Sequence, residues 1–304
     1  MNFRGDDEMR RVLILFNKRS GMPRSIESIS WKAKALLAES GCEVSVDESL
    51  SVDDGQNKAV KAVDHGFDSV IVVGGDGMVN SIGSVLVGTE TALGVIPVGS
   101  GNGFARHFNI PLKPEIAVRG IKHVCKRRID VGMVDEKPFF VTCSMAWDAA
   151  IVRTFDKLPF RGVLPYVFSA VYEFFEYERQ PFHVLLENME ELYFESPVIF
   201  TAANLTQYGG GAKIAPGASP DDGYLELIVI SQADAPRVLA KFHKLFDGTI
   251  DKMEEVLTRQ FKKLKVIRSK PAPIQIDGEL VEAGREVVID VHPESLSVLV
   301  PEDM

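Results

Sequence analysis

Cysteine is scarce in this chain of 304 residues. Only Cys42, Cys125 and Cys143 are present, and no two of them form a CxxC pair. This spacing matches neither a disulfide framework nor a zinc site, so we expect a reducing compartment. The six histidines show no metal-ligand spacing either, and we interpret them as structural or surface residues.

Long apolar runs and an excess of positive charge are also missing. A membrane-spanning helix needs about 18 consecutive apolar residues, and charged residues interrupt the chain before any apolar stretch reaches that length. The first ten residues include acidic side chains and contain no apolar stretch, so no signal peptide is predicted. The formal net charge of -9 would repel a phosphate backbone, so nucleic acid is not an expected partner. We therefore expect a cytoplasmic protein whose contact with any membrane is peripheral.

The first part of the chain has the pattern of an α/β domain. Short apolar runs rich in branched residues alternate with segments of helical periodicity. This βαβαβ order predicts a parallel sheet with helices on both faces. The expected strands are residues 11–16, 44–49, 69–73 and 92–96, and the expected helices are residues 25–40, 56–64, 79–87 and 102–108.

From about Val131 the pattern changes to short alternating segments separated by Gly, Pro and Asp turns, which predicts mostly antiparallel β structure. We expect domains at residues 1–130 and 131–295, with a last strand near residues 296–301 returning to the first domain. The expected strands of the second domain include residues 139–143, 183–187, 197–203, 224–230, 263–268 and 287–291.

Two glycine-rich turns follow neighbouring strands of the predicted sheet. The sequence Gly-Gly-Asp-Gly at residues 74–77 follows one strand, and a second glycine turn at residues 97–106 follows the next. Because parallel strands end at the same edge, both turns and the polar turn at residues 17–21 should flank one crevice. Outward N–H groups at a helix start suit phosphate. For one such turn alone, an ordinary tight turn that needs glycine is the alternative.

The glycine turns match neither the Walker A pattern nor the Rossmann GxGxxG pattern. The chain resembles instead the diacylglycerol kinase catalytic family, which includes bacterial YegS-like lipid kinases and sphingosine kinases. The order and approximate spacing of its motifs hold from about residue 12 to residue 301. The resemblance rests on residues 17–21, on Gly-Gly-Asp-Gly-Met-Val-Asn at 74–80, on Pro-Val-Gly-Ser-Gly-Asn-Gly-Phe-Ala-Arg at 97–106, on residues 215–225, on Asp-Gly-Glu at 277–279 and on residues 298–301.

The resemblance implies an N-terminal nucleotide-binding α/β domain of the NAD kinase/phosphofructokinase-like type and a C-terminal antiparallel β-sandwich, with an active-site cleft between them. It also implies an ATP-dependent enzyme of phospholipid metabolism that phosphorylates a hydroxyl of diacylglycerol or a similar lipid at the inner face of the membrane. Homodimer formation stays open. The positions that match the family's ATP-binding residues are Asn17, Lys18, Arg19, Ser20, Gly21, Ser49, Gly74, Gly75, Asp76, Gly77, Met78, Val79, Asn80, Ser100 and Asn102.

Some of these assignments leave alternatives. Ser51 competes with Ser49 for the hydroxyl that follows the second strand. Asp277 and Glu279 are the carboxylates from which the resemblance suggests the general base that phosphoryl transfer needs, and the choice between them is open. A solvated turn is the alternative to either role.

The resemblance also implies Mg²⁺ held by Asp222 and the carbonyls of Ser219 and Tyr224, apart from the Mg²⁺ that accompanies ATP. This oxygen set suits the ion, and a solvated Asp-Asp-Gly turn is the alternative. The chain departs from the family pattern at Lys18, usually Pro, and at Met78, usually Thr.

A third departure is Gly103, where the family usually has Asp.

The competing functions are an NAD kinase-like enzyme, which shares the first glycine turn, and a nucleotide- or lipid-binding regulator without turnover. Residues 158–175 crowd aromatic and aliphatic side chains into a helical stretch, which predicts core packing, with a wall that admits lipid or an interfacial helix as the alternative.

Overall fold

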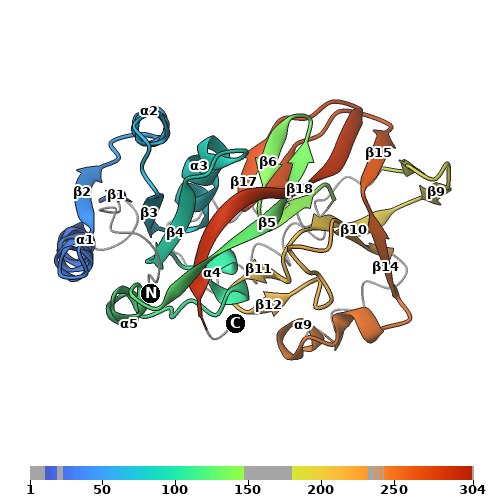
Figure 1. The fold of residues 1–304 in the computed structure, drawn as a ribbon. Helices are drawn as coiled ribbons and strands as arrows, with labels where there is room; N and C mark the ends of the chain where they lie inside the picture. Colours follow the sequence, from blue (N-terminus) through green and yellow to red (C-terminus); the bar gives the residue numbers. More distant parts are fainter. Residues whose placement is uncertain are drawn as a thin grey trace. The chain divides into compact units, whose positions relative to one another are not determined.

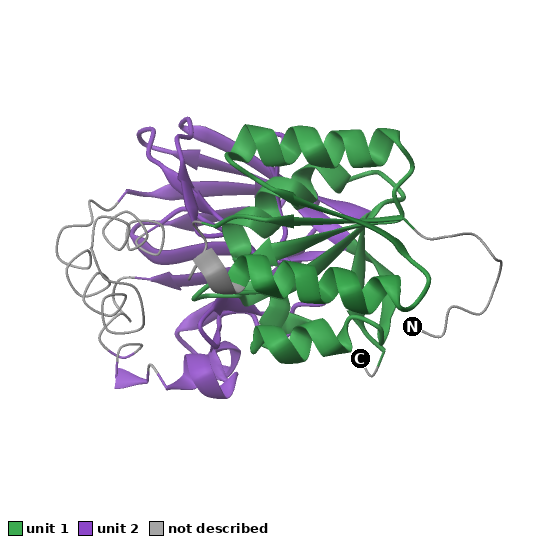
Figure 2. Ribbon diagram, turned by 90° about the vertical axis from the view of Figure 1, so that its left-hand side faces the viewer, with its two compact units in different colours: residues 1–129, 294–304 green, residues 130–293 purple. Residues whose placement is uncertain are grey.

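The chain forms two compact units, which Figure 2 colours separately. The computed structural model describes residues 11–18, 23–146, 180–231, 237, 240, 241 and 243–302. The first unit comprises residues 1–129 and 294–304, and the second unit comprises residues 130–293. The end of the chain therefore belongs to the same unit as its beginning.

The sheet of the first unit is parallel, with the spatial order β2-β1-β3-β4. Every residue of β3 is buried, as expected for a strand whose two faces are covered by helices. After β4 comes the last part of β18, where Val298 lies beside Leu93 in parallel register. The strands are β1 Arg11–Phe16, β2 Glu43–Glu48, β3 Ser69–Gly74 and β4 Ala92–Pro97.

Helices flank this sheet. Figure 1 shows α2 and α3 on one side of the strands and α1 and α5 on the other. Helix α2 begins at Val52, earlier than the apolar spacing predicts, because the Ser51 side chain accepts the N–H of Asp54 at 3.1 Å and caps it. The helices are α1 Pro23–Ala38, α2 Val52–Asp64, α3 Asp76–Leu86, α4 Gly103–His107 and α5 Pro114–Gly120.

The second unit is an antiparallel β-sandwich. One sheet pairs β18 with β15, β15 with β8 and β8 with β9, and the other has the order β14-β13-β10-β7-β16-β17. The elements after α5 are β5 Val124–Val134, β6 Lys137–Phe139, β7 Thr142–Ser144, β8 Phe182–Leu186, β9 Glu191–Phe194, β10 Pro197–Ala203, β11 Gln207–Gly209, β12 Ala212–Lys213, β13 Leu225–Ser231, α9 Lys244–Asp247, η2 Ile250–Lys252, β14 Val256–Phe261, β15 Lys263–Arg268, β16 Ile274–Ile276, β17 Glu279–Val281 and β18 Glu286–Pro301.

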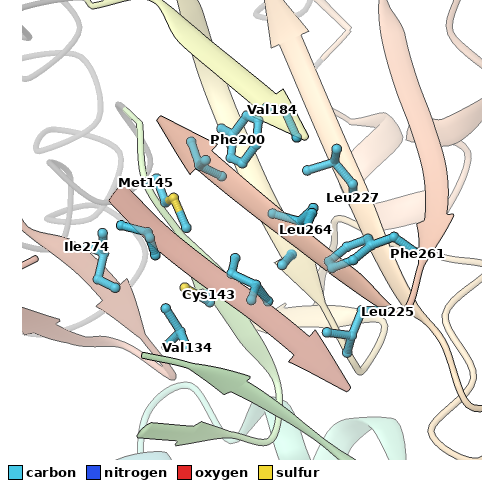
Figure 3. Packing of buried hydrophobic residues seen from close by; sticks show 14 of the residues in the cluster. Val134, Cys143, Met145, Val184, Phe200, Leu225, Leu227, Phe261, Leu264 and Ile274 are labelled. Carbon is cyan, nitrogen blue, oxygen red and sulfur yellow. The ribbon is translucent and has the colours of Figure 1, made fainter. Parts of the chain in front are cut away.

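The core of the sandwich contains side chains from both sheets. Val184 and Leu264 of one sheet belong to the same buried cluster as Phe200 and Leu227 of the other (Figure 3). Alternating residues on the outer face of the second sheet pack instead with Leu245 of α9 and other apolar side chains. Both parts of the predicted fold class, a parallel α/β domain and an antiparallel β-sandwich, are confirmed.

Two strand predictions need correction. Residues 139–143 are not one strand, because β6 ends at Phe139 and β7 begins at Thr142. The N–H groups of Phe140 and Val141, which lie between them, donate to a side chain instead of a neighbouring strand. Residues 287–291 and 298–301 are parts of a single strand, β18.

Gly132 of β5 provides a test of this packing. It pairs with Phe139 across the β5-β6 hairpin, and a Cβ at Gly132 would overlap the Phe139 ring. We predict that Gly132→Ala lowers the free energy of unfolding by about 1–3 kcal/mol, the usual cost of overpacking. Urea denaturation of both proteins measures this. Gly217→Ala is the control, since Gly217 has open space around it, and equal losses in both variants would contradict the prediction.

Candidate functional site

The predicted ATP-binding residues of the first unit follow the carboxyl ends of its parallel strands. Asn17 and Lys18 come after β1, Ser49 after β2, residues 74–80 run from β3 into α3, and residues 98–102 follow β4. Since β2, β1, β3 and β4 are neighbours, these segments share one edge of the sheet. Arg19, Ser20 and Gly21 lie outside the described residues.

The two glycine turns touch through their backbones. A Cβ on Gly99 would lie 2.7 Å from the Cα of Gly75, a distance that side-chain carbons essentially never adopt. The N–H of Val98 also donates to the carbonyl of Gly74 at 3.0 Å. Glycine is therefore required here for close approach, and the contact fixes one turn against the other.

Asp76 joins the same two turns. As the first residue of α3, it accepts the N–H of Gly103 at 3.1 Å and that of Phe104 at 3.3 Å through its two carboxylate oxygens. Burial raises the pKa of the Asp76 carboxyl above its ordinary value, while these N–H donors lower it. Asp76 thus has a structural role that the sequence pattern did not reveal, in addition to the predicted contact with nucleotide.

Asn102 shapes the second turn. It is buried in a left-handed conformation with φ of 51°, and its amide nitrogen donates to the carbonyl of Gly99 at 2.8 Å. The Nε of Arg106 donates to the carbonyl of Gly101 at 3.0 Å, which secures the turn from the other side. Ser100, in contrast, is exposed at the surface.

The two candidate serines after β2 have different roles. Ser49 is buried and its hydroxyl donates to the carbonyl of Ser51 at 2.9 Å, whereas the Ser51 hydroxyl caps α2. Ser49 has space only because residue 55 is glycine, since a Cβ at Gly55 would lie 2.5 Å from the Ser49 hydroxyl oxygen. Both serines therefore stabilise the turn that leads into α2.

Two departures from the family pattern have visible contacts. Lys18 forms ion pairs with Glu48 at 2.8 Å and Glu27 at 3.5 Å, and the hydrogen bond to Glu48 raises the pKa of Lys18. Met78 folds back against the end of β3, where a Cβ at Gly74 would lie 2.8 Å from its sulfur atom. Of the remaining predicted residues, Gly77 and Asn80 are partly buried and Val79 is buried.

The Asp-Gly-Glu sequence of the second unit is a two-residue β-hairpin. Ile276 of β16 pairs with Glu279 of β17, and Asp277 and Gly278 form the turn with φ of 48° and 93°. Two positive φ values are typical of the tight hairpin turn that Asp-Gly favours. Local sequence alone therefore favours this turn.

The carboxylates of this turn differ in environment. Asp277 is only 7% exposed and accepts the N–H groups of Phe140, Val141 and Thr142 at 2.8, 2.8 and 3.0 Å. Its own N–H donates to the carbonyl of Thr142 at 3.0 Å. Glu279 is exposed. The structure thus separates a carboxylate that holds the turn from one that reaches the surface.

The predicted Mg²⁺ ligands share one loop of the second unit. Asp222 accepts the N–H of Tyr224 at 3.0 Å and the side-chain amide of Gln260 at 3.4 Å, and the hydroxyl of Ser219 donates to Asp221 at 2.9 Å. Within the described ranges, no three His, Cys, Asp or Glu side chains gather as a metal site. The loop offers oxygen ligands, the kind that Mg²⁺ prefers, and among the three predicted ligands Asp222 is the one that supplies a carboxylate.

Sequence reasoning missed two buried polar residues of the second unit. Asp130 accepts the N–H of Gly223 at 2.7 Å, and Asn204 donates to the carbonyls of Asp130 and Phe140. Neither lies in a motif used above. Residues 158–175, for which core packing or a wall that admits lipid is predicted, lie outside the described residues. Among the helices that the structure describes, none has both the length and the apolar character for crossing a bilayer.

Both units match models of known protein families. Residues 11–134 match the model of the diacylglycerol kinase catalytic domain, and residues 142–300 match that of the YegS C-terminal NAD kinase beta sandwich-like domain. The fold and these matches define the class of protein, which is a lipid kinase. More specifically, the chain belongs to the diacylglycerol kinase/YegS-like lipid kinase family.

Individual relatives extend over nearly the whole chain. A diacylglycerol kinase of Mycobacterium tuberculosis is 28% identical over 97% of this chain and 96% of its own length. A diacylglycerol kinase of Bacillus subtilis is 25% identical over 89% of this chain and 90% of its own length. The crystal structure of a diacylglycerol kinase from Bacillus anthracis has a TM-score of 0.74 at 16% identity, covering 98% of this chain and 99% of its own. This structural likeness supports the fold.

The raised pKa of Asp76 predicts how pH affects stability. The folded protein holds this proton more tightly than the unfolded chain, whose pKa is near the ordinary 3.8. The resulting stabilisation is complete below that value and is lost as pH rises through the folded pKa. We therefore predict that wild type loses stability relative to Asp76→Asn as pH rises through this window. Urea denaturation of both proteins at each pH measures the difference, and the opposite slope would contradict the prediction.

Proposed function

We propose that this protein transfers the γ-phosphoryl group of ATP to a hydroxyl of diacylglycerol or a similar lipid. The observation that carries the proposal is the backbone contact of Gly75 and Gly99 together with the Asp76 carboxylate, which fix two glycine turns at one sheet edge. Helix α3 begins at the first turn, so its N–H groups and dipole favour phosphate there. Membership of a lipid kinase family supports the lipid as acceptor.

The carboxylate of Glu279 is the proposed general base. In the reaction, the lipid oxygen forms a bond to the γ-phosphorus while the bond from that phosphorus to the bridging oxygen of ADP breaks. The hydroxyl proton passes to a carboxylate, and the departing ADP oxygen takes the bonding electron pair. Glu279 is exposed, whereas the oxygens of Asp277 already accept three backbone N–H groups. Asp277 positions the turn.

Magnesium and a membrane complete the proposal. Mg²⁺ bound with ATP supplies charge neutralisation of the phosphates, which phosphoryl transfer requires. The oxygen groups of Ser219, Asp222 and Tyr224 are the proposed ligands of a separate ion. Because the acceptor is a lipid, the enzyme meets it at the inner face of the membrane, and the product enters phospholipid biosynthesis.

An acceptor screen tests this function. ATP consumption is measured with diacylglycerol, monoacylglycerol, phosphatidylglycerol and sphingoid bases in vesicles, and with NAD and a water-soluble polyol as controls. We expect turnover with one of the lipids and only background hydrolysis with either control. Phosphorylation of NAD would replace the proposal with the NAD kinase alternative. ATP binding without turnover on any acceptor would favour a regulator.

The contact between the glycine turns makes a prediction for ATP binding. In Gly99→Ala, the added Cβ would meet the backbone of Gly75, so the turns must separate. We expect an ATP analogue to bind at least about tenfold more weakly, equivalent to about 1.4 kcal/mol. Isothermal titration calorimetry measures the affinity. Gly120→Ala, which has open space in α5, is the control, and unchanged affinity in Gly99→Ala would remove these turns from the ATP site.

The two carboxylates of the hairpin can be separated by parallel measurements. Glu279→Gln should lower kcat about a hundredfold or more, because its carboxylate acts as the base, and should lower the melting temperature less than Asp277→Asn does, because Glu279 is exposed. Asp277→Asn should lower the free energy of unfolding by about 1–3 kcal/mol, because an amide N–H would face a backbone N–H. Loss of stability in Glu279→Gln alone would reverse the assignment. Wild-type kcat in both variants would show that the turn is only structural.

A further inference from the structure

Asn204 is a fully buried amide in the second unit, just after β10. Its Nδ2 donates to the carbonyl of Asp130 at 2.9 Å and to the carbonyl of Phe140 at 3.1 Å. Its Oδ1 is buried and has no hydrogen-bond partner among the residues that the structure describes. The position therefore uses the two N–H donors of the amide, and a flipped amide would place an oxygen against two carbonyls.

The segment from Phe140 to Thr142 forms hydrogen bonds through both its N–H groups and its carbonyls. Its three N–H groups point at the carboxylate of Asp277. Two of its carbonyls accept from the Asn204 region: the side-chain amide donates to the Phe140 carbonyl, and the N–H groups of Asn204 and Leu205 donate to the Val141 carbonyl. Buried backbone groups need hydrogen-bond partners. Losing the bonds to these carbonyls should therefore weaken the bonds from the N–H groups to Asp277.

The same amide connects this segment to the Asp-Asp-Gly loop. Asp130, whose carbonyl accepts from Asn204, donates its N–H to the carbonyl of Pro220 at 2.6 Å. Its carboxylate accepts the N–H of Gly223 at 2.7 Å. Asp130 is 1% exposed, so these hydrogen bonds are shielded from water. The Asn204 side chain thus connects residues 140–142 with the Asp-Asp-Gly loop through Asp130, although the two segments lie more than fifty residues apart in the sequence.

We propose that Asn204 is a positioning residue: it holds residues 140–142 where they bind Asp277, and through Asp277 it orients the turn that presents Glu279. The same amide fixes the Asp-Asp-Gly loop through Asp130. Its effect on the reaction rests on the proposed function, with Glu279 as base. Its effect on the two loops does not depend on turnover.

Amide hydrogen exchange measured by NMR, together with kinetics, tests the proposal. In Asn204→Leu, which removes both donors without adding charge, exchange should accelerate at least about tenfold at Val141, Thr142 and Gly223, as expected for loss of buried hydrogen bonds. Exchange at Ile228, within β13, should stay unchanged. The kcat should fall about tenfold or more while KM for ATP stays within about twofold, since the base and not the ATP site is displaced.

A milder variant and a matched control separate positioning from general damage. Asn204→Ser retains one donor and should give intermediate exchange and kcat, and it replaces the leucine variant if that one fails to fold. The control is Thr201→Val in the same strand region, which removes a fully buried hydroxyl bonded to Ser144 at 3.0 Å and Tyr208 at 2.6 Å. In the control, amide exchange at Val141, Thr142 and Gly223 should match wild type, and so should kcat.

The outcomes distinguish this proposal from the proposed function. Wild-type exchange in the Asn204 variants would overturn it, whatever their turnover. Faster exchange with wild-type kcat would show that Asn204 is structural and does not position the base. An equal loss of kcat in Thr201→Val would also overturn it. If wild type shows no turnover with any lipid, the proposed function fails, and exchange alone still decides whether Asn204 holds the turn.

Discussion

A buried carboxylate must be hydrogen-bonded, and three aspartates of this protein accept backbone N–H groups from distant parts of the chain. Asp76 accepts from the start of α4, Asp130 accepts from Gly223, and Asp277 accepts from residues 140–142. Each of these bonds joins two separate segments of the same unit. Aspartate is well suited to this role because its short side chain offers two oxygens close to its own backbone.

This constraint gives the two carboxylates of the Asp-Gly-Glu turn different environments. The tight hairpin already favours Asp-Gly at its centre, and the three N–H donors then fix the Asp277 side chain. Glu279, at the first position of β17, remains exposed. The proposed general base is therefore an exposed glutamate two residues after an aspartate that three N–H groups hold, and proton transfer depends on such positioning.

The glycine turns of the first unit follow a related principle. Close backbone contact between Gly75 and Gly99 leaves no room for side chains, and Asn102 closes its turn in a left-handed conformation. The absence of side chains at these glycines suits the close approach of phosphate that the proposed function requires. The Lys18 ammonium at the same edge is paired with Glu48 and Glu27, so its charge is already partly neutralised by the protein itself.

The sequence by itself determined the parallel strands from Arg11 to Pro97, the β-rich second unit and the turns that carry the family pattern, because hydrophobic periodicity and glycine placement are local signals. Its assignments of ATP and Mg²⁺ ligands stay predictions. Only the tertiary structure showed that Asp277 is buried and hydrogen-bonded while Glu279 is exposed, and that β6 is separate from β7, because the partners of Asp277 lie more than 130 residues away. The importance of Asp130 and Asn204 could not be predicted for the same reason. A buried hydrogen bond between a side chain and a distant backbone group produces no periodic pattern in the sequence.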